Sequence, residues 1–383
     1  MFDSLISFVR EQYRTNEFIP LHAPIFKGNE RDYVVETIES TFVSSVGAFV
    51  DRFERDMSAY TGSPKAIATV NGTAALHASL LLAGVKAGEL VITQPLTFVA
   101  TCNAIAYCGA EPVFIDVDRH TLGLSPVALD EWLHEYANLD ADGLCRLKDS
   151  GKVVRACLPM HTFGHPVEID QLLAVGKRWG LIIVEDAAES LGSLYKGQHT
   201  GTFGQLGTLS FNGNKIITTG GGGMILTGEE LGVKAKHLTT TAKLPHPYEY
   251  VHDEVGYNYR LPNLNAALGC AQLEQLEGFI TLKRSLAARY ESELQGSELQ
   301  FFQEPKDCRS NYWLNAVVCE NRDRRDALLK ATNDQGVMTR PIWQLMNHLP
   351  KYATCLRGDL SNATWLEARI VNLPSSVTPE LSA

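Results

Sequence analysis

The chain has 383 residues, 45% hydrophobic and 20% charged, which is enough for one large or two modest globular domains. Its 44 acidic residues outnumber its 34 basic ones, and the net charge of −10 argues against nucleic acid or an anionic membrane as a main partner. The eight cysteines form no CxxC or zinc-ligand spacing, and the opening MFDSLISFVREQYRTNEF has no signal-peptide core. We therefore expect a cytoplasmic protein with reduced thiols.

In chain order, short apolar runs alternate with helical stretches through the first half of the sequence. The predicted strands lie at 66–70, 90–93, 112–117, 153–160 and 181–186, and the predicted helices at 73–85, 97–109 and 169–180. The strands are nearly continuous apolar runs, as expected where helices cover both faces of a sheet. The alternation therefore predicts an α/β fold with a mostly parallel sheet flanked by helices.

The pattern changes near residue 262. The stretch from 263 to about 295 carries apolar residues at helical spacing. Beyond it, YWLNAVVC (312–319) is typical of a strand, and DRRDALLKATNDQG (323–336) is typical of a helix that a glycine ends. We predict a large domain over residues 1–262 and a smaller C-terminal α+β domain over residues 263–383.

Two stretches place polar residues at predicted strand ends. In VNGTAALHA (70–78) a strand runs into a helix with Thr73 as a suitable N-cap, and free N–H groups at a helix N-terminus can hold a phosphate. In VEDAAESLGS (184–193), Asp186 ends an apolar strand, where open α/β sheets bind ligands and where a buried acid needs a cation. Taken singly, the first is more often a capped turn without a ligand, and the second is equally well a helix cap or a salt-bridge partner.

A third stretch, SFNGNKIITTGGGG (210–223), sets Lys215 between Ser210 and four glycines. A lysine that reacts covalently with a bound molecule requires close approach of backbone, which glycine permits. A reactive lysine, an acid for a pyridine nitrogen, and amides and hydroxyls for a phosphate are the parts of a pyridoxal phosphate (PLP) site. Phe98 in PLTFVA is placed to cover one face of the cofactor ring.

Motifs follow one another in order along nearly the whole chain: GNERDYVVETIESTFVSSVG, FERDMSAYTG, NGTAAL, PLTFVATCNAI, GAEPVFIDVD, HTFGHP, EDAAESLGS, SFNGNKIITTGGGGMILT and GYNYRLPNLNAALGCAQLEQL. Together they resemble the DegT/DnrJ/EryC1/StrS family of PLP-dependent sugar aminotransferases, which have the type I fold. STFVSSVG, SFNGNK and RPIWQLM are similar to the branch of the legionaminic-acid and bacillosamine pathways. That branch aminates the 4-keto carbon of UDP-2-acetamido-2,6-dideoxy-hexos-4-ulose, usually with glutamate as donor.

The resemblance implies a role for each cofactor residue. Lys215 forms the Schiff base and moves protons, Asp186 pairs with the pyridine nitrogen, and Phe98 stacks on the ring. Glu189 lies near the 3-oxygen of the cofactor. The phosphate is held by the remaining residues, which are Thr73, Ala74 through its N–H, Ser210, and Asn258 from the neighbouring subunit. The implied functional unit is a homodimer with shared active sites.

The resemblance also implies where substrate contacts lie. Arg260 supports the cofactor loop or the substrate, while Arg340 and Lys27 are candidates for the nucleotide phosphates. In LMNHLPKY, Asn347 stands where the family often has a histidine, and His348 follows one residue later. The segment 134–152 is longer and more polar than the usual family connection, and we expect a solvated loop there.

The implied reaction has two halves: glutamate gives its amino group to the cofactor, and a sugar ketone then receives it. Alternatives within this family are a GDP-perosamine-synthase-like enzyme and a 3-keto-sugar aminotransferase. A sugar dehydratase of the same fold would have histidine in place of Lys215. A PLP-binding regulator without turnover is an alternative from a different class of protein. Glutamate distinguishes the two, because it would bleach the yellow colour of a transaminase.

Overall fold

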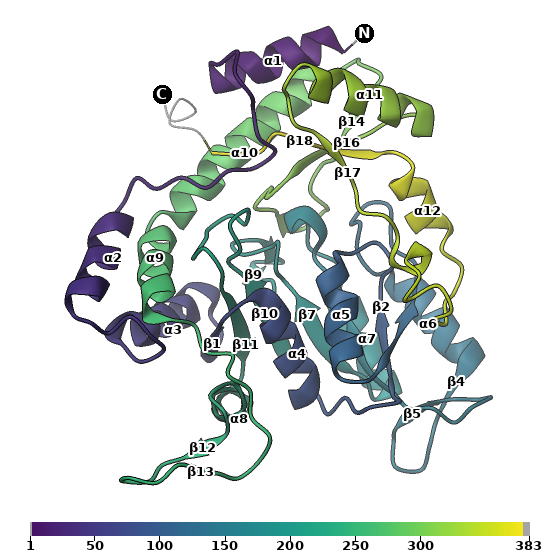
Figure 1. Cartoon of the computed structure of the whole chain (residues 1–383). Helices are drawn as coiled ribbons and strands as arrows, with labels where there is room; N and C mark the ends of the chain where they lie inside the picture. Colours follow the sequence, from purple (N-terminus) through teal and green to yellow (C-terminus); the bar gives the residue numbers. More distant parts are fainter. Residues whose placement is uncertain (1, 378–383) are drawn as a thin grey trace.

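The computed structural model describes residues 2–377 and is built on a seven-stranded sheet with strand order β1-β11-β10-β7-β6-β2-β3 (Figure 1). The strands are β1 (Lys65–Thr69), β2 (Leu90–Thr93), β3 (Glu111–Phe114), β6 (Val154–Leu158), β7 (Ile182–Asp186), β10 (Leu206–Ser210) and β11 (Gly223–Thr227). Strand β11 pairs antiparallel with β1 and β10, and the other pairs are parallel. The predicted mostly parallel α/β sheet is confirmed.

Apolar residues face both sides of this sheet. Ile67, Val91, Val184 and Ile225 belong to the core shared with α4 (Gly72–Leu82), α5 (Val99–Tyr107) and α8 (Glu229–Thr239). Their neighbours along the strands belong to two cores on the other side. The helices there are α3 (Ala48–Thr61), α6 (Pro126–Tyr136), α7 (Ile169–Trp179) and α9 (Asn263–Leu273). Burial of both faces explains why the strands read as continuous apolar runs.

A smaller four-stranded sheet with strand order β14-β16-β18-β17 forms the C-terminal part of the chain. Its strands are β14 (Gln300–Phe301), β16 (Asn315–Val318), β17 (Arg340–Pro341) and β18 (Ile370–Leu373). The helices around it are α10 (Leu276–Glu293), α11 (Arg322–Asp334) and α12 (Ser361–Glu367). Strand β15 (Cys308–Arg309) leaves this part and pairs with β8 (Leu194–Tyr195), which also pairs with β9 (Gln198–His199).

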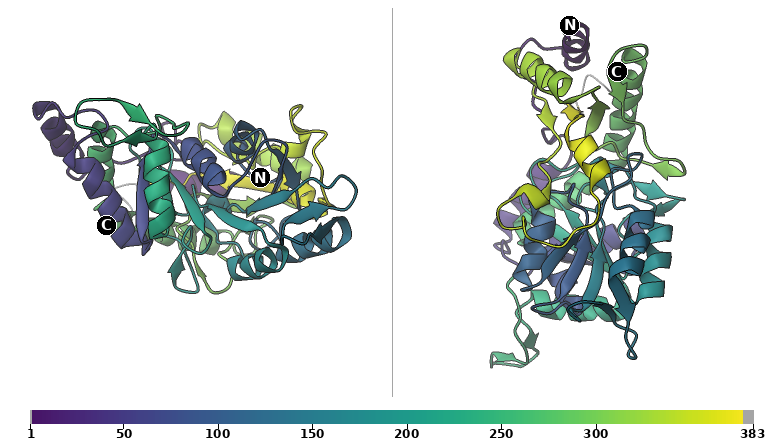
Figure 2. Two further views of the ribbon diagram at one scale, coloured as in Figure 1. Left: turned by 90° about the horizontal axis from the view of Figure 1, so that it is seen from below. Right: turned by 90° about the vertical axis from the view of Figure 1, so that its right-hand side faces the viewer.

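The N-terminal helix α1 (Asp3–Tyr13) lies at the same end of the molecule as this second sheet, as Figure 1 and the right view of Figure 2 show. Leu5 and Val9 of α1 share an apolar core with Leu286 and Tyr290 of α10. We propose a division into a large domain over residues 1–262 and a smaller domain over residues 263–383. Helix α1 belongs to the first by sequence but packs on the second.

The segment 134–152 is not the solvated loop that its polarity led us to expect. After α6 it forms a hairpin of β4 (Ala137–Leu139) and β5 (Cys145–Leu147), with Cys145 and Leu147 buried. Asp140 makes the turn, because its Oδ1 accepts from the N–H groups of Asp142 and Leu144, both at 2.9 Å. This expectation was wrong because a local side-chain turn and two inward apolar residues outweighed the polar composition.

A second hairpin, β12 (Lys243–Leu244) with β13 (Val251–His252), projects from the end of the molecule opposite α1 (Figures 1 and 2). Tyr248 and Tyr250 near its tip are 84% and 82% exposed. The helix α2 (Glu30–Glu39) lies beside α9 at the edge of the molecule. Across residues 2–377, no helix has both the length and the apolar character that crossing a membrane requires.

Candidate active site

One cavity of about 340 Å³ collects most of the predicted cofactor residues at the ends of the central strands. Its lining includes Thr73, Phe98, Asp186, Glu189, Ser210 and Lys215. They come from the start of α4, the residue before α5, the end of β7 and its following turn, the end of β10, and the loop between β10 and β11. The carboxyl ends of parallel strands meet at one edge of a sheet, which explains why distant stretches converge here.

Asp186 ends β7 and is 2% exposed. Its Oδ2 accepts a hydrogen bond from the Thr101 hydroxyl at 2.8 Å, and its Oδ1 accepts from the Ala188 N–H at 3.2 Å. Burial raises the pKa of this carboxyl, while Thr101, Ala188 and the charge of Lys215 act in the opposite direction. Among residues 2–377, its carboxylate has no ion-pair partner. A protonated pyridine nitrogen would supply the missing cation, so this residue fits PLP.

Lys215 and Glu189 form a pair inside the cavity. The Lys215 side chain is 12% exposed, and its Nζ lies 3.2 Å from Oε1 of Glu189, whose side chain is 1% exposed. The other Glu189 oxygen accepts from the Phe163 N–H at 2.9 Å. Phe163 takes a left-handed φ of 57° to present this N–H, a conformation that costs a bulky residue roughly 1–3 kcal/mol. The loop is thus shaped to hold a carboxyl beside the lysine.

Glu189→Gln is expected to change how the stability of the cofactor-free protein depends on pH. Burial raises the pKa of Glu189 from 4.5 to about 7, despite the opposing charge of Lys215. Between these values the folded protein holds a proton that the unfolded chain has lost. The stability contributed by this carboxyl is therefore fully present below about pH 4.5 and is lost as the pH rises through about 7. The glutamine variant should gain stability relative to wild type across this window.

The measurement is the thermal unfolding midpoint of both proteins, without cofactor, from about pH 4.5 to about pH 8. Glu230→Gln is the control, because the exposed Glu230 pairs with Lys234 and its pKa is lowered. That variant should show no gain across the same window. A constant difference between Glu189→Gln and wild type would show that the pKa of Glu189 is not raised.

The start of α4 faces the last residue of β10. Thr73 is not the N-cap that the sequence predicted, because Asn71 occupies that position and its Oδ1 accepts from the Ala74 N–H at 2.8 Å. Ala74 can donate to a phosphate only when Asn71 releases this bond. A Cβ on Gly72 would lie 2.8 Å from the Cβ of Ser210, so the helix start and this serine are packed closely. The resulting hollow of N–H groups and a hydroxyl fits a phosphate.

Aromatic rings form the opposite wall. Phe98 is 49% exposed, and its ring centroid lies 6.4 Å from that of Trp343, which in turn lies 5.2 Å from that of Phe163. Trp313 also lines the cavity. Sequence reasoning missed both tryptophans and Thr101. For Thr101 a signal was present, since it stands three residues after Phe98 in the first turn of α5 and so faces the same way.

Six predicted residues lie outside the lining of this cavity as residues 2–377 form it: Lys27, Ala74, Asn258, Arg260, Arg340 and His348. Asn258 is exposed and accepts a hydrogen bond at its Oδ1 from Arg260 Nε at 2.9 Å. Arg340 is exposed on β17, and His348 lies 3.9 Å from Glu367. The backbone around Arg260 nevertheless pairs with Thr69 and Val70, just before the start of α4, so the segment 258–260 runs beside the phosphate end without lining the cavity.

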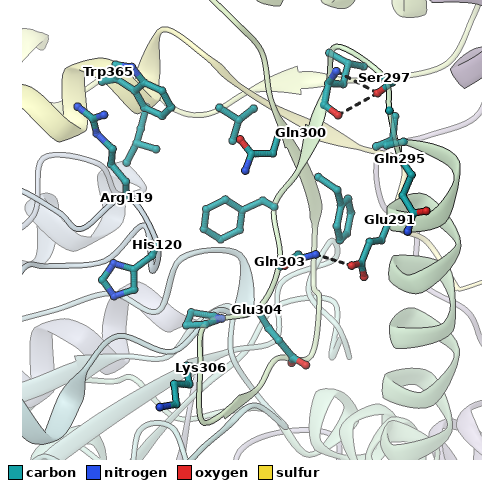
Figure 3. Close-up of a pocket in the computed structure, with 18 residues that line it drawn as sticks. Arg119, His120, Glu291, Gln295, Ser297, Gln300, Gln303, Glu304, Lys306 and Trp365 are labelled. Atoms are coloured by element: carbon teal, nitrogen blue, oxygen red, sulfur yellow. Dashed lines mark hydrogen bonds between the residues drawn. The ribbon is translucent and has the colours of Figure 1, made fainter.

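A larger cavity, of about 850 Å³, lies between the loop at residues 119–120 and the edge of the smaller sheet (Figure 3). Arg119, His120 and Lys306 line it together with Glu291 and Glu304, so charges of both signs are present. None of the predicted site residues lines it. The volume of a cavity therefore does not identify the reactive site. The smaller cavity is identified by the lysine and carboxyl groups that converge in it.

Comparison with known proteins gave one family and many relatives. The sequence model of the DegT/DnrJ/EryC1/StrS aminotransferase family matches residues 24–382. The GDP-perosamine synthase of Escherichia coli O157:H7 is 36% identical over 360 residues, covering 94% of this chain and 93% of that protein. The GDP-perosamine synthase of Caulobacter vibrioides is 36% identical over 362 residues, 93% of each. A DegT DnrJ EryC1 StrS aminotransferase from Brucella abortus has a TM-score of 0.82 at 27% identity, covering 91% and 90% of the two chains.

Proposed function

Because this chain belongs to the DegT/DnrJ/EryC1/StrS aminotransferase family, a family of PLP-dependent sugar aminotransferases, we propose that it aminates a nucleotide-linked keto sugar with L-glutamate as donor. The strongest support for this proposal is that one cavity, beside the start of α4, is lined by Lys215, Glu189 and Asp186. The complete set of Lys215, Asp186, Thr73 and Ser210 in one cavity favours turnover over a regulator that only binds the cofactor. A sugar dehydratase of this fold would lack the lysine.

Each residue of the site has a defined task in this proposal. PLP, when bound, supplies an electron sink that makes the carbon beside the donor nitrogen acidic. Asp186 holds the proton on the pyridine nitrogen, and the hydrogen bonds from Thr101 and Ala188 fix its orientation. Lys215 moves protons from its Nζ, beside the Glu189 carboxyl at 3.2 Å. The aromatic wall around Phe98 excludes water from one side of the cavity.

The proposed acceptor is a UDP-linked 4-keto-6-deoxy-N-acetylhexosamine. Its support is the resemblance of STFVSSVG, SFNGNK and RPIWQLM to enzymes that use this substrate. The names of two relatives at 36% identity favour a second candidate, GDP-4-keto-6-deoxymannose. Both candidates have a ketone at carbon 4 beside a carbon that carries a methyl group, so Lys215, Glu189 and Asp186 would have the same tasks with either substrate.

We expect faster amination of the UDP-linked 4-keto-6-deoxy-N-acetylhexosamine than of any GDP- or dTDP-linked keto sugar. The test incubates the purified protein with glutamate and a panel of these substrates and identifies each product by NMR. Comparison of kcat/KM values removes differences in saturation between the substrates. A clear preference for GDP-4-keto-6-deoxymannose would support the perosamine-synthase-like alternative instead.

We further propose a homodimer in which Asn258 acts in the partner's site. Asn258 is exposed and lies outside the cavity that its own chain forms. The segment from Val35 to Val46 exposes five large apolar side chains, which are Val35, Ile38, Phe42, Val43 and Val46, at 41–70%. Several large apolar side chains exposed along one short segment are typical of an interaction site. A second copy of the chain is the partner that would cover it and complete the phosphate end.

Mixed dimers test this proposal. Lys215→Ala and Asn258→Asp should each be nearly inactive, the second because a carboxylate repels the cofactor phosphate. In a mixed dimer with shared sites, both lesions fall in one site and the other site is intact. Unfolding and refolding the two variants together in equal amounts should therefore restore roughly a quarter of wild-type activity.

Lys215→Ala mixed with Asp186→Asn is the matched control. Both residues line the cavity of the same chain, so each site of a mixed dimer keeps one lesion and no activity should return. Native mass spectrometry shows whether mixed dimers have formed. If they have formed and Asn258→Asp restores nothing, Asn258 acts within its own subunit.

A further inference from the structure

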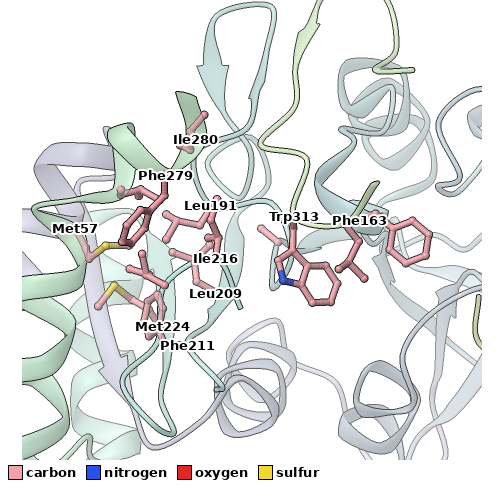
Figure 4. Packing of buried hydrophobic residues seen from close by; sticks show 14 of the residues in the cluster. Met57, Phe163, Leu191, Leu209, Phe211, Ile216, Met224, Phe279, Ile280 and Trp313 are labelled. Carbon is pink, nitrogen blue, oxygen red and sulfur yellow. The ribbon is translucent and has the colours of Figure 1, made fainter. Parts of the chain in front are cut away.

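Trp313 contacts the amine of Lys215 and the backbone of the residue before it. Its indole is 4% exposed and lines the cavity, and Lys215 Nζ lies 4.1 Å from the centroid of its ring. Its Nε1 donates to the backbone carbonyl of Asn214, the residue before the lysine, at 2.7 Å. In Figure 4, Trp313 is drawn between the larger group of core side chains and Phe163. The indole therefore contacts the Lys215 amine with its ring face and the peptide carbonyl just before Lys215 with its N–H.

The two contacts limit where the amine can go. A lysine side chain is flexible, and an unattached amine inside a cavity would sample several rotamers. Trp313 attracts the ammonium through its ring face, and Glu189 attracts it through Oε1 at 3.2 Å. The hydrogen bond to Asn214 fixes the peptide group from which the side chain starts. Ring, carboxyl and backbone together define one position for Nζ.

The backbone around Trp313 is held in an unusual shape. Tyr312 has a left-handed φ of 47°, which is unfavourable for a bulky residue and persists only where its surroundings determine it. Asn311 supplies such a constraint: its Oδ1 accepts from the Trp313 N–H at 2.8 Å. Its Nδ2 donates to the carbonyls of Glu189 and Leu191, each at 2.9 Å. The same asparagine thus ties Trp313 to the loop that carries Glu189.

Gly164 leaves the space that the Asn311 side chain needs to link Trp313 to the Glu189 loop. Gly164 has a φ of 94°, and a Cβ there would overlap Oδ1 of Asn311. Ser310 donates through its hydroxyl to the Gly164 carbonyl at 3.0 Å, and the Asn311 N–H donates to the Ser193 hydroxyl at 2.9 Å. The segment 310–313, which leads into the smaller sheet, is therefore inserted among the loops of the larger part.

We propose that Trp313 is a positioning residue for Lys215. It holds the unattached amine at one place, so that the lysine rejoins the cofactor and handles protons from the same position in each half-reaction. The inference rests on the proposed role of Lys215 and adds a residue that acts through that lysine. It also makes the C-terminal part of the chain a contributor to the reactive site.

The test measures how fast cofactor-free protein joins PLP. Protein and PLP are mixed, samples are reduced with borohydride at intervals, and mass spectrometry quantifies the link at Lys215. Trp313→Phe keeps a ring but removes the N–H and weakens the ring's attraction, and Trp313→Leu removes both contacts. We expect the rate to fall about threefold in the first variant and about thirtyfold in the second.

The Lys215→Ala background separates an effect on the lysine from an effect on the fold. There, adding Trp313→Leu should lower the non-covalent affinity for PLP, measured by equilibrium dialysis, by a smaller factor than the fall in the joining rate that Trp313→Leu causes when Lys215 is present. Trp365→Leu is the matched control, since Trp365 stacks between Arg119 and Arg369 outside the cavity. It should join PLP at the wild-type rate.

The outcomes are distinct. Wild-type rates in both Trp313 variants would overturn the proposal, as would an equal loss of PLP affinity in the Lys215→Ala background. If Trp313→Leu does not fold, the Phe variant carries the test alone. A reducible link that persists in Lys215→Ala would overturn the assignment of the lysine itself, whatever the tryptophan variants do.

Discussion

Lys215→Ala is expected to abolish the borohydride-reducible link to PLP and to remove transamination. The lysine is the amine in the cavity, where its Nζ lies 3.2 Å from Glu189 and 4.1 Å from the ring of Trp313. Without it, none of the residues that line the cavity has an amine to form the covalent link, and the proposed proton carrier between donor and cofactor is lost. Turnover should fall by at least roughly 10⁴-fold, as when a residue acting both as nucleophile and as base is removed.

The fold should survive this change. Removing the amine leaves the buried Glu189 without its cation, but the pKa of Glu189 is already raised to about 7, so the carboxyl can take up a proton instead. Absorbance in the visible, peptide mapping after borohydride reduction, and circular dichroism are the measurements. Lys234→Ala, at an exposed lysine paired with Glu230, is the control and should match wild type. A Lys215→Ala protein with normal turnover would refute the assignment.

Asp186→Asn is expected to lower turnover roughly 10²–10³-fold, the usual size for one electrostatic contact at a reacting centre. An amide cannot stabilise a protonated pyridine nitrogen as a carboxylate does, so the electron sink weakens. The fold should persist, because asparagine has the same shape and its oxygen can still accept from Thr101 or Ala188. Removing a buried carboxyl whose pKa is raised by burial also relieves an unfavourable desolvation.

The measurement for Asp186→Asn compares single-turnover rates with glutamate and the pH dependence of the bound cofactor's spectrum. The proton on the ring nitrogen should be lost at a lower pH in the variant than in wild type. Asp170→Asn is the control, since Asp170 bonds Tyr195 and Lys196 away from the cavity. Near-normal turnover together with an unchanged spectrum would assign the pyridine contact to another residue.

Much of this architecture was readable from the sequence. Strands buried on both faces are apolar throughout, and LVIT at 90–93 matches the bounds of β2. Asp186 and Lys215 could be singled out because each breaks a local rule, an acid at the end of an apolar strand and a lysine among glycines. Parallel topology then brings strand ends together without any knowledge of distances.

Other features depend on contacts between segments far apart in the chain. Trp313 looks like any core aromatic in YWLNAVVC, and only the structure shows the Lys215 amine over its ring. The place of α1 depends on the partner of its apolar face, which the sequence does not name. The sequence predicts Thr73 as the N-cap, but Thr and Asn both suit that position, and in the structure Asn71 occupies it.

The most direct test of the proposed function follows the amino group itself. The purified protein is incubated with ¹⁵N-labelled L-glutamate and the UDP-linked 4-keto-6-deoxy-N-acetylhexosamine, and the products are analysed by NMR and mass spectrometry. We predict one ¹⁵N at carbon 4 of the sugar for each 2-oxoglutarate formed, and no transfer by Lys215→Ala. A sugar that remains unlabelled across the UDP-, GDP- and dTDP-linked panel, with active cofactor bound, would contradict amination of a nucleotide-linked sugar by this protein.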